Sequence, residues 1–155
     1  MYPESIMGII PNLSTGIFGQ RTYDMIVTNY RLIFARPSKE TVNQEHEKAM
    51  AGVQGEGLLT RWKTSIASGF NYHQRYYQMP PEAILREGPD NFEIRPEQVT
   101  KIRVYPGQFI DDYSNRTSHT MKIKWSGGKI KYSFDQTEPS QIVNLLKPML
   151  GNRVK

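Results

Sequence analysis

The segment SHTMKIKWSGGKIKYSF, residues 118–134, constrains the fold more than any other part of the chain. Two runs of alternating apolar and basic residues flank a pair of glycines, which is a strong short-range signal for an antiparallel β-hairpin. With Gly127 and Gly128 as the loop, Lys124 lies opposite Lys131. The side expected to face the core carries Met121, Ile123, Trp125, Ile130, Tyr132 and Phe134. The opposite side carries Lys122, Lys124, Lys129 and Lys131.

A second hairpin is predicted in YDMIVTNYRLIFARP, residues 23–37. This run is longer than a usual single strand, and an asparagine near its centre tolerates the positive φ of a tight turn. With Asn29 and Tyr30 as the loop, Met25 pairs with Phe34. The side that we expect to face the core carries Met25, Val27, Leu32 and Phe34.

The rest of the chain adds short strands and a terminal helix. Strands are predicted where short apolar runs are bounded by proline and glycine, at residues 6–18, 92–94 and 99–105. Residues 108–117 are predicted to form a loop. From about Glu138 to Leu150, apolar residues recur at helical spacing before Gly151, which predicts an amphipathic C-terminal helix.

Residues 38–90 separate the two strand-rich parts and have a helical period. A helix is predicted to begin near Ser38 or Thr41, and a second covers residues 58–79. A short third helix follows at residues 82–87. This segment is therefore a helical insertion in a mainly β chain.

Composition excludes several classes of protein. A length of 155 residues suits one domain, residues 1–155, and no apolar run approaches the roughly 20 residues of a transmembrane helix. The absence of cysteine excludes disulfides and thiolate metal sites. The first residues lack a secretory signal, so we expect a cytoplasmic protein, with a peripheral position at the membrane as the alternative. Residues 118–155 carry seven basic and two acidic groups, which accounts for the whole net charge of +5.

The order of these elements resembles the pleckstrin-homology-like (PH-like) family. The stretch TYDMIVTNYRLIFA is similar to the second and third strands of its bacterial and archaeal members. The resemblance implies an α+β, mainly β fold, in which an antiparallel seven-stranded barrel or bent sheet is closed by a C-terminal helix. It covers residues 6–37 and 91–151, and leaves the helical insertion at 38–90 without a counterpart. It also implies a non-catalytic platform for lipid headgroups, peptides or copies of itself. The first two predicted strands offer little basic charge beyond Arg21, so headgroup binding does not transfer directly.

Two surfaces are candidates for binding. The first is the lysine side of the 119–134 hairpin, which Arg116 and His119 would extend and which suits an anion, an anionic lipid or an acidic partner. The alternative is a solvated face whose lysines prevent edge pairing. The second is the basic, aromatic helix at 58–79, as an interface for a partner or a membrane. Its candidate residues are Arg61, Lys63, Trp62, Ile66, Phe70 and Tyr77.

Signals for catalysis are weak. Gly52, Gly55 and Gly57 do not match nucleotide-binding spacings, and His46, His73 and His119 fall on different elements. We therefore predict no enzyme, no cofactor and no metal. Nucleic-acid binding is disfavoured because no exposed aromatic accompanies the lysines of the hairpin. The leading hypothesis is protein–protein association or self-association through the insertion, and the alternative is peripheral binding to anionic lipid.

Overall fold

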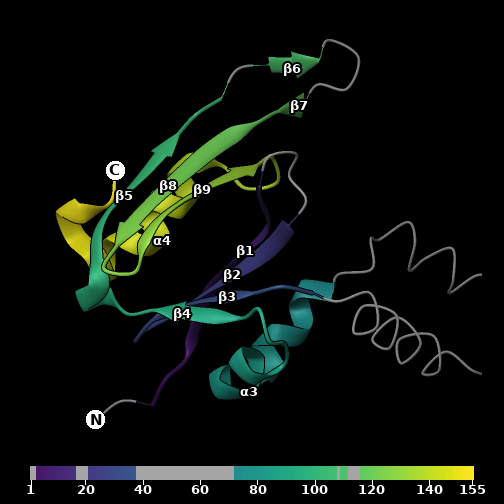
Figure 1. Cartoon of the computed structure of the whole chain (residues 1–155), viewed down its shortest axis with the longest axis vertical. Coiled ribbons are helices and arrows are strands. Elements are labelled where there is room, and N and C mark those ends of the chain that lie inside the picture. The colour runs from purple at the N-terminus through teal and green to yellow at the C-terminus, as the bar shows by residue number, and fades with distance from the viewer. Residues whose placement is uncertain (1–2, 17–20, 38–71, 108, 112–115) are drawn as a thin grey trace, which may run out of the picture.

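The computed structural model describes residues 3–16, 21–37, 72–107, 109–111 and 116–155. They form a mainly β structure with an antiparallel seven-stranded sheet in the order β4-β3-β2-β1-β9-β8-β5 (Figure 1). Its strands are β1 (Ile6–Thr15), β2 (Arg21–Thr28), β3 (Leu32–Ala35), β4 (Phe92–Ile94), β5 (Val99–Tyr105), β8 (His119–Trp125) and β9 (Gly128–Phe134). The predicted set of seven strands with a C-terminal helix is therefore present.

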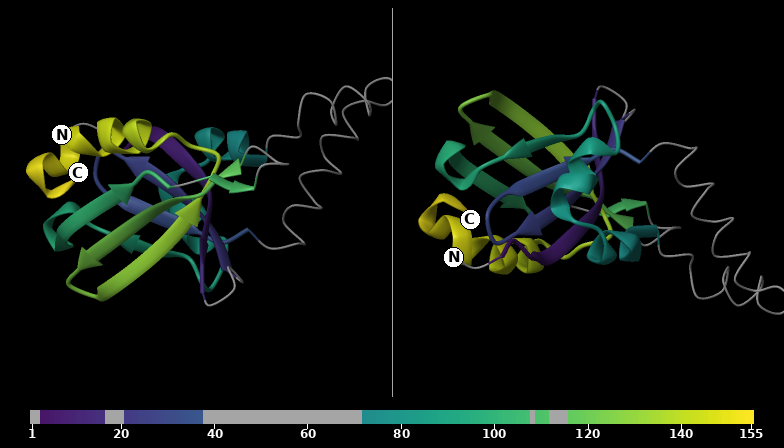
Figure 2. Two further views of the ribbon diagram at one scale, coloured as in Figure 1. Left: turned by 90° about the horizontal axis from the view of Figure 1, so that it is seen from above. Right: turned by 90° about the horizontal axis from the view of Figure 1, so that it is seen from below.

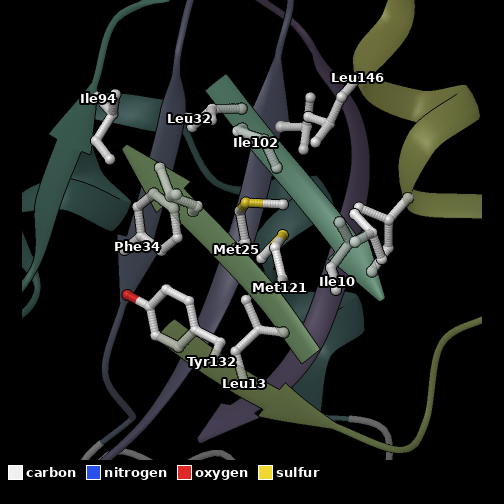
Figure 3. Close-up of a cluster of buried hydrophobic side chains, with 14 of the residues drawn as sticks. Ile10, Leu13, Met25, Leu32, Phe34, Ile94, Ile102, Met121, Tyr132 and Leu146 are labelled. Carbon is white, nitrogen blue, oxygen red and sulfur yellow. The ribbon is translucent and has the colours of Figure 1, made fainter. Parts of the chain in front are cut away.

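The sheet curls around one main core. Figure 2 shows β1–β4 on one side and β5, β8 and β9 on the other, with the helix α4 (Pro139–Leu150) beside them. Side chains from both halves and from α4 point toward one another in Figure 3, including Met25 of β2, Met121 of β8 and Leu146 of α4. The apolar stripe of α4 packs on the core as predicted, with Ile142 and Leu146 buried and Leu145 and Met149 partly buried. Gly151 ends the helix with a φ of 58°, which favours glycine.

The hairpin in residues 23–37 forms in the predicted register. Met25 pairs with Phe34 and Val27 with Leu32, around a turn at Asn29 and Tyr30. The predicted core side is buried in the main core. The opposite side is also buried, because two short helices cover it: the 3-10 helix η1 (Tyr72–Gln78) and α3 (Pro81–Arg86). This second cluster consists of Ile26, Ile33, Ala35, Tyr76 and Ile84.

The β8–β9 hairpin forms with a register two residues away from the predicted one. Its loop is Ser126–Gly127, so Trp125 pairs with Gly128 and Lys124 with Lys129 instead of Lys131. A Cβ on Gly127 would lie 2.4 Å from Nε1 of Trp125, so the indole beside the turn requires glycine there. A shift of two residues keeps every side chain on its predicted side. Trp125 therefore packs against the core, and Lys124 is exposed.

The remaining helix and loop predictions have mixed outcomes. The short third helix is confirmed as α3. The predicted loop at 108–117 is wrong, because it contains a two-stranded ribbon of β6 (Phe109–Asp111) and β7 (Arg116–Thr117). The turn at Pro96 is the 3-10 helix η2 (Pro96–Gln98), and another, η3 (Gly151–Arg153), follows α4. The helix predicted from Ser38 or Thr41 lies outside the described residues, as does most of the helix predicted at 58–79.

Candidate functional site

Six basic side chains gather on the outer side of three adjacent strands, β5, β8 and β9. Cross-strand pairing aligns them in two rows, one of which joins Lys101 to Lys124 and Lys124 to Lys129. The other row joins Arg103 to Lys122 and Lys122 to Lys131. We call this set the cationic face; its members are Lys101, Arg103, Lys122, Lys124, Lys129 and Lys131.

The dimensions of the cationic face follow from strand geometry. Neighbouring strands lie about 4.8 Å apart and alternate residues about 6.7 Å apart, so the Cα atoms of the six cations span about 10 by 7 Å. The side chains surround a shallow depression of about 490 Å³. None of the lining residues that the structure describes is acidic; they are Lys101, Arg103, Tyr105, Lys122, Ile123, Lys124, Lys129, Ile130 and Lys131. The described lining residues therefore concentrate positive charge on this face.

Protection of a free sheet edge does not explain all of these lysines. β8 is an interior strand, paired with β5 on one side and β9 on the other, so Lys122 and Lys124 do not guard a free edge. The true edge, β5, is partly covered by the C-terminus: Lys155 N donates to Ile102 O at 3.1 Å, and Val104 N donates to Lys155 O at 2.8 Å. Edge protection therefore does not explain Lys122 and Lys124, and a solvated outer face stays the alternative for these lysines.

Repulsion within the two rows opposes folding. Like charges directly across a strand pair cost a few tenths of a kcal/mol, and each row contains two such pairs. Long lysine side chains reduce this repulsion by spreading into water, where salt also screens it. An anion bound between the rows would remove the repulsion. The arrangement is therefore chemically suited to binding negative charge.

Two neighbours modify the cationic face. Nη1 of Arg103 donates to the backbone oxygens of Ile102 and Arg153, both at 3.2 Å, which holds this guanidinium toward the C-terminal turn. Tyr105 lies at the end of the face with 46% of its surface exposed, and Nζ of Lys122 lies 5.4 Å from the centroid of its ring. An exposed aromatic of β5 therefore lies beside Lys122, although the lysine side of the hairpin itself carries none, and the expectation against nucleic acid stays a prediction.

The predicted site residues have different positions. The four hairpin lysines lie together as expected on the outer side of the sheet. Arg116 begins β7, and its side chain lies outside the described part of the chain. His119 is buried, and its Nδ1 accepts a hydrogen bond from Gly107 N at 3.0 Å, so it does not extend the cationic face as predicted. His119 lies two residues before Met121 in β8, so both side chains point to the inward side of the strand.

Most residues proposed for the second surface are not described. Arg61, Trp62, Lys63, Ile66 and Phe70 lie outside the described residues. Tyr77 is described, and 52% of its surface is exposed on η1. The interface and membrane hypotheses for residues 58–79 therefore stay predictions.

Sequence reasoning missed the contribution of β5. Lys101, Arg103 and Tyr105 alternate with the buried Ile102 and Val104 in VTKIRVY. The alternation was a usable signal, because residues two apart share one face of a strand. The sequence alone does not indicate that β5 pairs with β8. This pairing places the two sets of cations side by side.

A buried polar cluster joins η1 to the sheet. Asp24 of β2 is fully buried and accepts hydrogen bonds from the Tyr76 hydroxyl at 2.9 Å and from Asn12 N at 3.1 Å. His73 Nε2 lies 3.0 Å from Asp24 Oδ1. Asn12 has a φ of 57° at a bulge in β1, which turns its N–H toward this carboxylate. The cluster fixes η1 against the sheet.

A second cluster surrounds Arg31, which follows the β2–β3 turn. Its guanidinium contacts three carboxylates, those of Glu4, Glu82 and Glu93. The hydrogen bond from Arg31 lowers the pKa of Glu93. These contacts tie the N-terminal segment, α3 and β4 to one hairpin. Among the described residues, no group of three or more histidine and carboxylate side chains is arranged to hold a metal ion.

Comparisons of the chain with protein-family models, with curated proteins and with solved structures found no match. Within the described ranges, no helix has the length and apolar character needed to cross a membrane.

Proposed function

We propose that the chain is a non-catalytic binding module that attaches to anionic membrane surfaces through the cationic face. The observation that carries this proposal is the alignment of six cations in two cross-strand rows, including two on the interior strand β8. The antiparallel seven-stranded sheet and the C-terminal helix are features that the PH-like resemblance implies, and they support the assignment to that group of platforms.

A membrane suits this face better than a single small anion. The cations cover an open area and not an enclosed pocket, so they match many phosphates in a plane. Each lysine or arginine close to an anionic bilayer contributes about 1 kcal/mol to binding. Tyr105 lies exposed at the rim of the cationic face. Tyrosine side chains prefer the boundary between headgroups and hydrocarbon in a bilayer, so this position suits contact with a membrane. Electrostatic attraction of this kind weakens as salt shortens the Debye length.

Vesicle flotation tests the proposal. We expect the protein to float with vesicles that contain about one-third phosphatidylglycerol in phosphatidylcholine at low salt. Binding should fall steeply as ionic strength rises, and vesicles of pure phosphatidylcholine should not retain the protein. Equal recovery on neutral and anionic vesicles, or no binding to anionic vesicles at low salt, would reject the proposal.

Self-association through residues 38–90 is the second candidate. It is favoured by Tyr77, which is exposed on η1 although its neighbour Tyr76 anchors that helix to the sheet. An exposed aromatic on a fixed element is suited to contact a second copy of the chain. Light scattering over a range of protein concentrations tests this candidate, and a monomer at the highest concentration would reject it.

A further inference from the structure

A recess lies beside the cationic face, next to the end of β1, the start of β2 and β9. Among the described residues, β1 and β9 share one registered pair, Ser14 with Ser133, close to the end of each strand. The recess next to this pair has a volume of about 610 Å³, and its described lining residues are Ser14, Thr15, Gly16, Arg21, Lys129, Ile130, Lys131 and Ser133.

The chemistry of the recess is that of an anion site. Its lining supplies three hydroxyl groups, from Ser14, Thr15 and Ser133, and three cations, from Arg21, Lys129 and Lys131. None of the described lining residues carries a carboxylate. Hydroxyl groups can donate to phosphate oxygens, and arginine and lysine form charge-assisted hydrogen bonds with them.

We propose that this recess binds a phosphomonoester group. The inference rests on the proposed function, because Lys129 and Lys131 belong both to the recess and to the cationic face. A terminal phosphate presents three free oxygens and up to two negative charges, so it can use the hydroxyls and the cations together. A phosphodiester presents two free oxygens and carries substituents on both sides, which hinders its entry between β1 and β9. The recess would therefore add headgroup selectivity to an otherwise nonselective cationic face.

Two vesicle types of matched surface charge test the inference. One contains phosphatidic acid, a phosphomonoester, and the other contains phosphatidylglycerol, a phosphodiester, both in phosphatidylcholine. We expect about tenfold tighter binding to the phosphatidic acid vesicles. Equal binding to both would overturn the inference and leave the proposed function standing, whereas binding to neither would overturn both.

Variants locate the selectivity. Ser14→Ala/Ser133→Ala removes two hydroxyls without changing charge, so we expect the tenfold preference to fall to about twofold or less while phosphatidylglycerol binding is retained. Arg21→Gln tests the same recess from β2, and urea unfolding checks that each variant is folded. A preference that survives in all these variants would overturn the inference.

Free glycerol 3-phosphate distinguishes the source of the phosphate. Competition at millimolar concentration that releases the protein from phosphatidic acid vesicles, but not from phosphatidylglycerol vesicles, would identify a soluble phosphomonoester as a ligand of the recess. Retention on phosphatidic acid vesicles under the same conditions would assign the group to a lipid headgroup. Release from both vesicle types alike would overturn the assignment of selectivity to the recess.

Discussion

Replacing Asp24 by alanine is expected to lower the free energy of unfolding by about 3–5 kcal/mol. The carboxylate is fully buried and accepts hydrogen bonds from the Tyr76 hydroxyl and from Asn12 N, with His73 Nε2 also in contact. Alanine removes the acceptor and leaves a cavity between β2 and η1. Urea unfolding followed by circular dichroism measures this change.

Two comparisons make the Asp24 prediction specific. Asp24→Asn keeps the size and one acceptor oxygen, so it should cost less than Asp24→Ala. Asp90→Ala removes a carboxylate that is 56% exposed and pairs with Arg36, and it should cost at most about 1 kcal/mol. If Asp24→Ala were as mild as Asp90→Ala, the carboxylate would not be the group that fixes η1 to the sheet.

The double variant Lys122→Glu/Lys124→Glu is expected to weaken binding to anionic vesicles by at least about a hundredfold. Each substitution replaces an attraction by a repulsion, and both positions lie at the centre of the two rows. Both side chains are exposed, so the fold should be retained. Flotation on phosphatidylglycerol vesicles measures the loss.

A matched variant separates the cationic face from net charge. Lys147→Glu/Arg86→Glu changes the charge of the chain by the same amount at exposed positions on α4 and α3. We expect it to weaken binding by only a few fold, because these charges lie outside the cationic face. Equal losses in the two double variants would mean that the overall charge, not the two rows, governs binding.

The hairpins were predictable because their signals are local. In β2–β3, a turn at Asn29 and Tyr30 sets the register as predicted, but Asn29 does not have the positive φ expected of it. The hydroxyl of Thr28 accepts hydrogen bonds from Tyr30 N and Arg31 N and so stabilises the turn. In β8–β9, the alternation of lysines with apolar residues fixes which side faces the core, even though the loop is Ser126–Gly127 and not Gly127–Gly128. Two adjacent glycines allow either loop, and the packing of Trp125 against the turn, which selects one of them, is a tertiary contact.

The rest of the site depends on contacts between distant residues. Lys101 and Lys124 become neighbours through the pairing of β5 with β8, which no local pattern specifies. Asp24 and Tyr76 are 52 positions apart, so their hydrogen bond has no sequence signal. The burial of His119 likewise depends on its contact with Gly107, on the other side of the β6–β7 ribbon.

Lysine footprinting on vesicles tests the central claim most directly. The protein would be acetylated with a water-soluble reagent, free and bound to phosphatidylglycerol vesicles, and the modified positions identified by mass spectrometry. We predict that bound protein shows strong protection of Lys101, Lys122, Lys124, Lys129 and Lys131, while Lys147 on α4 stays reactive. Unchanged reactivity of the cationic face in vesicle-bound protein, or protection of Lys147 in its place, would contradict the account.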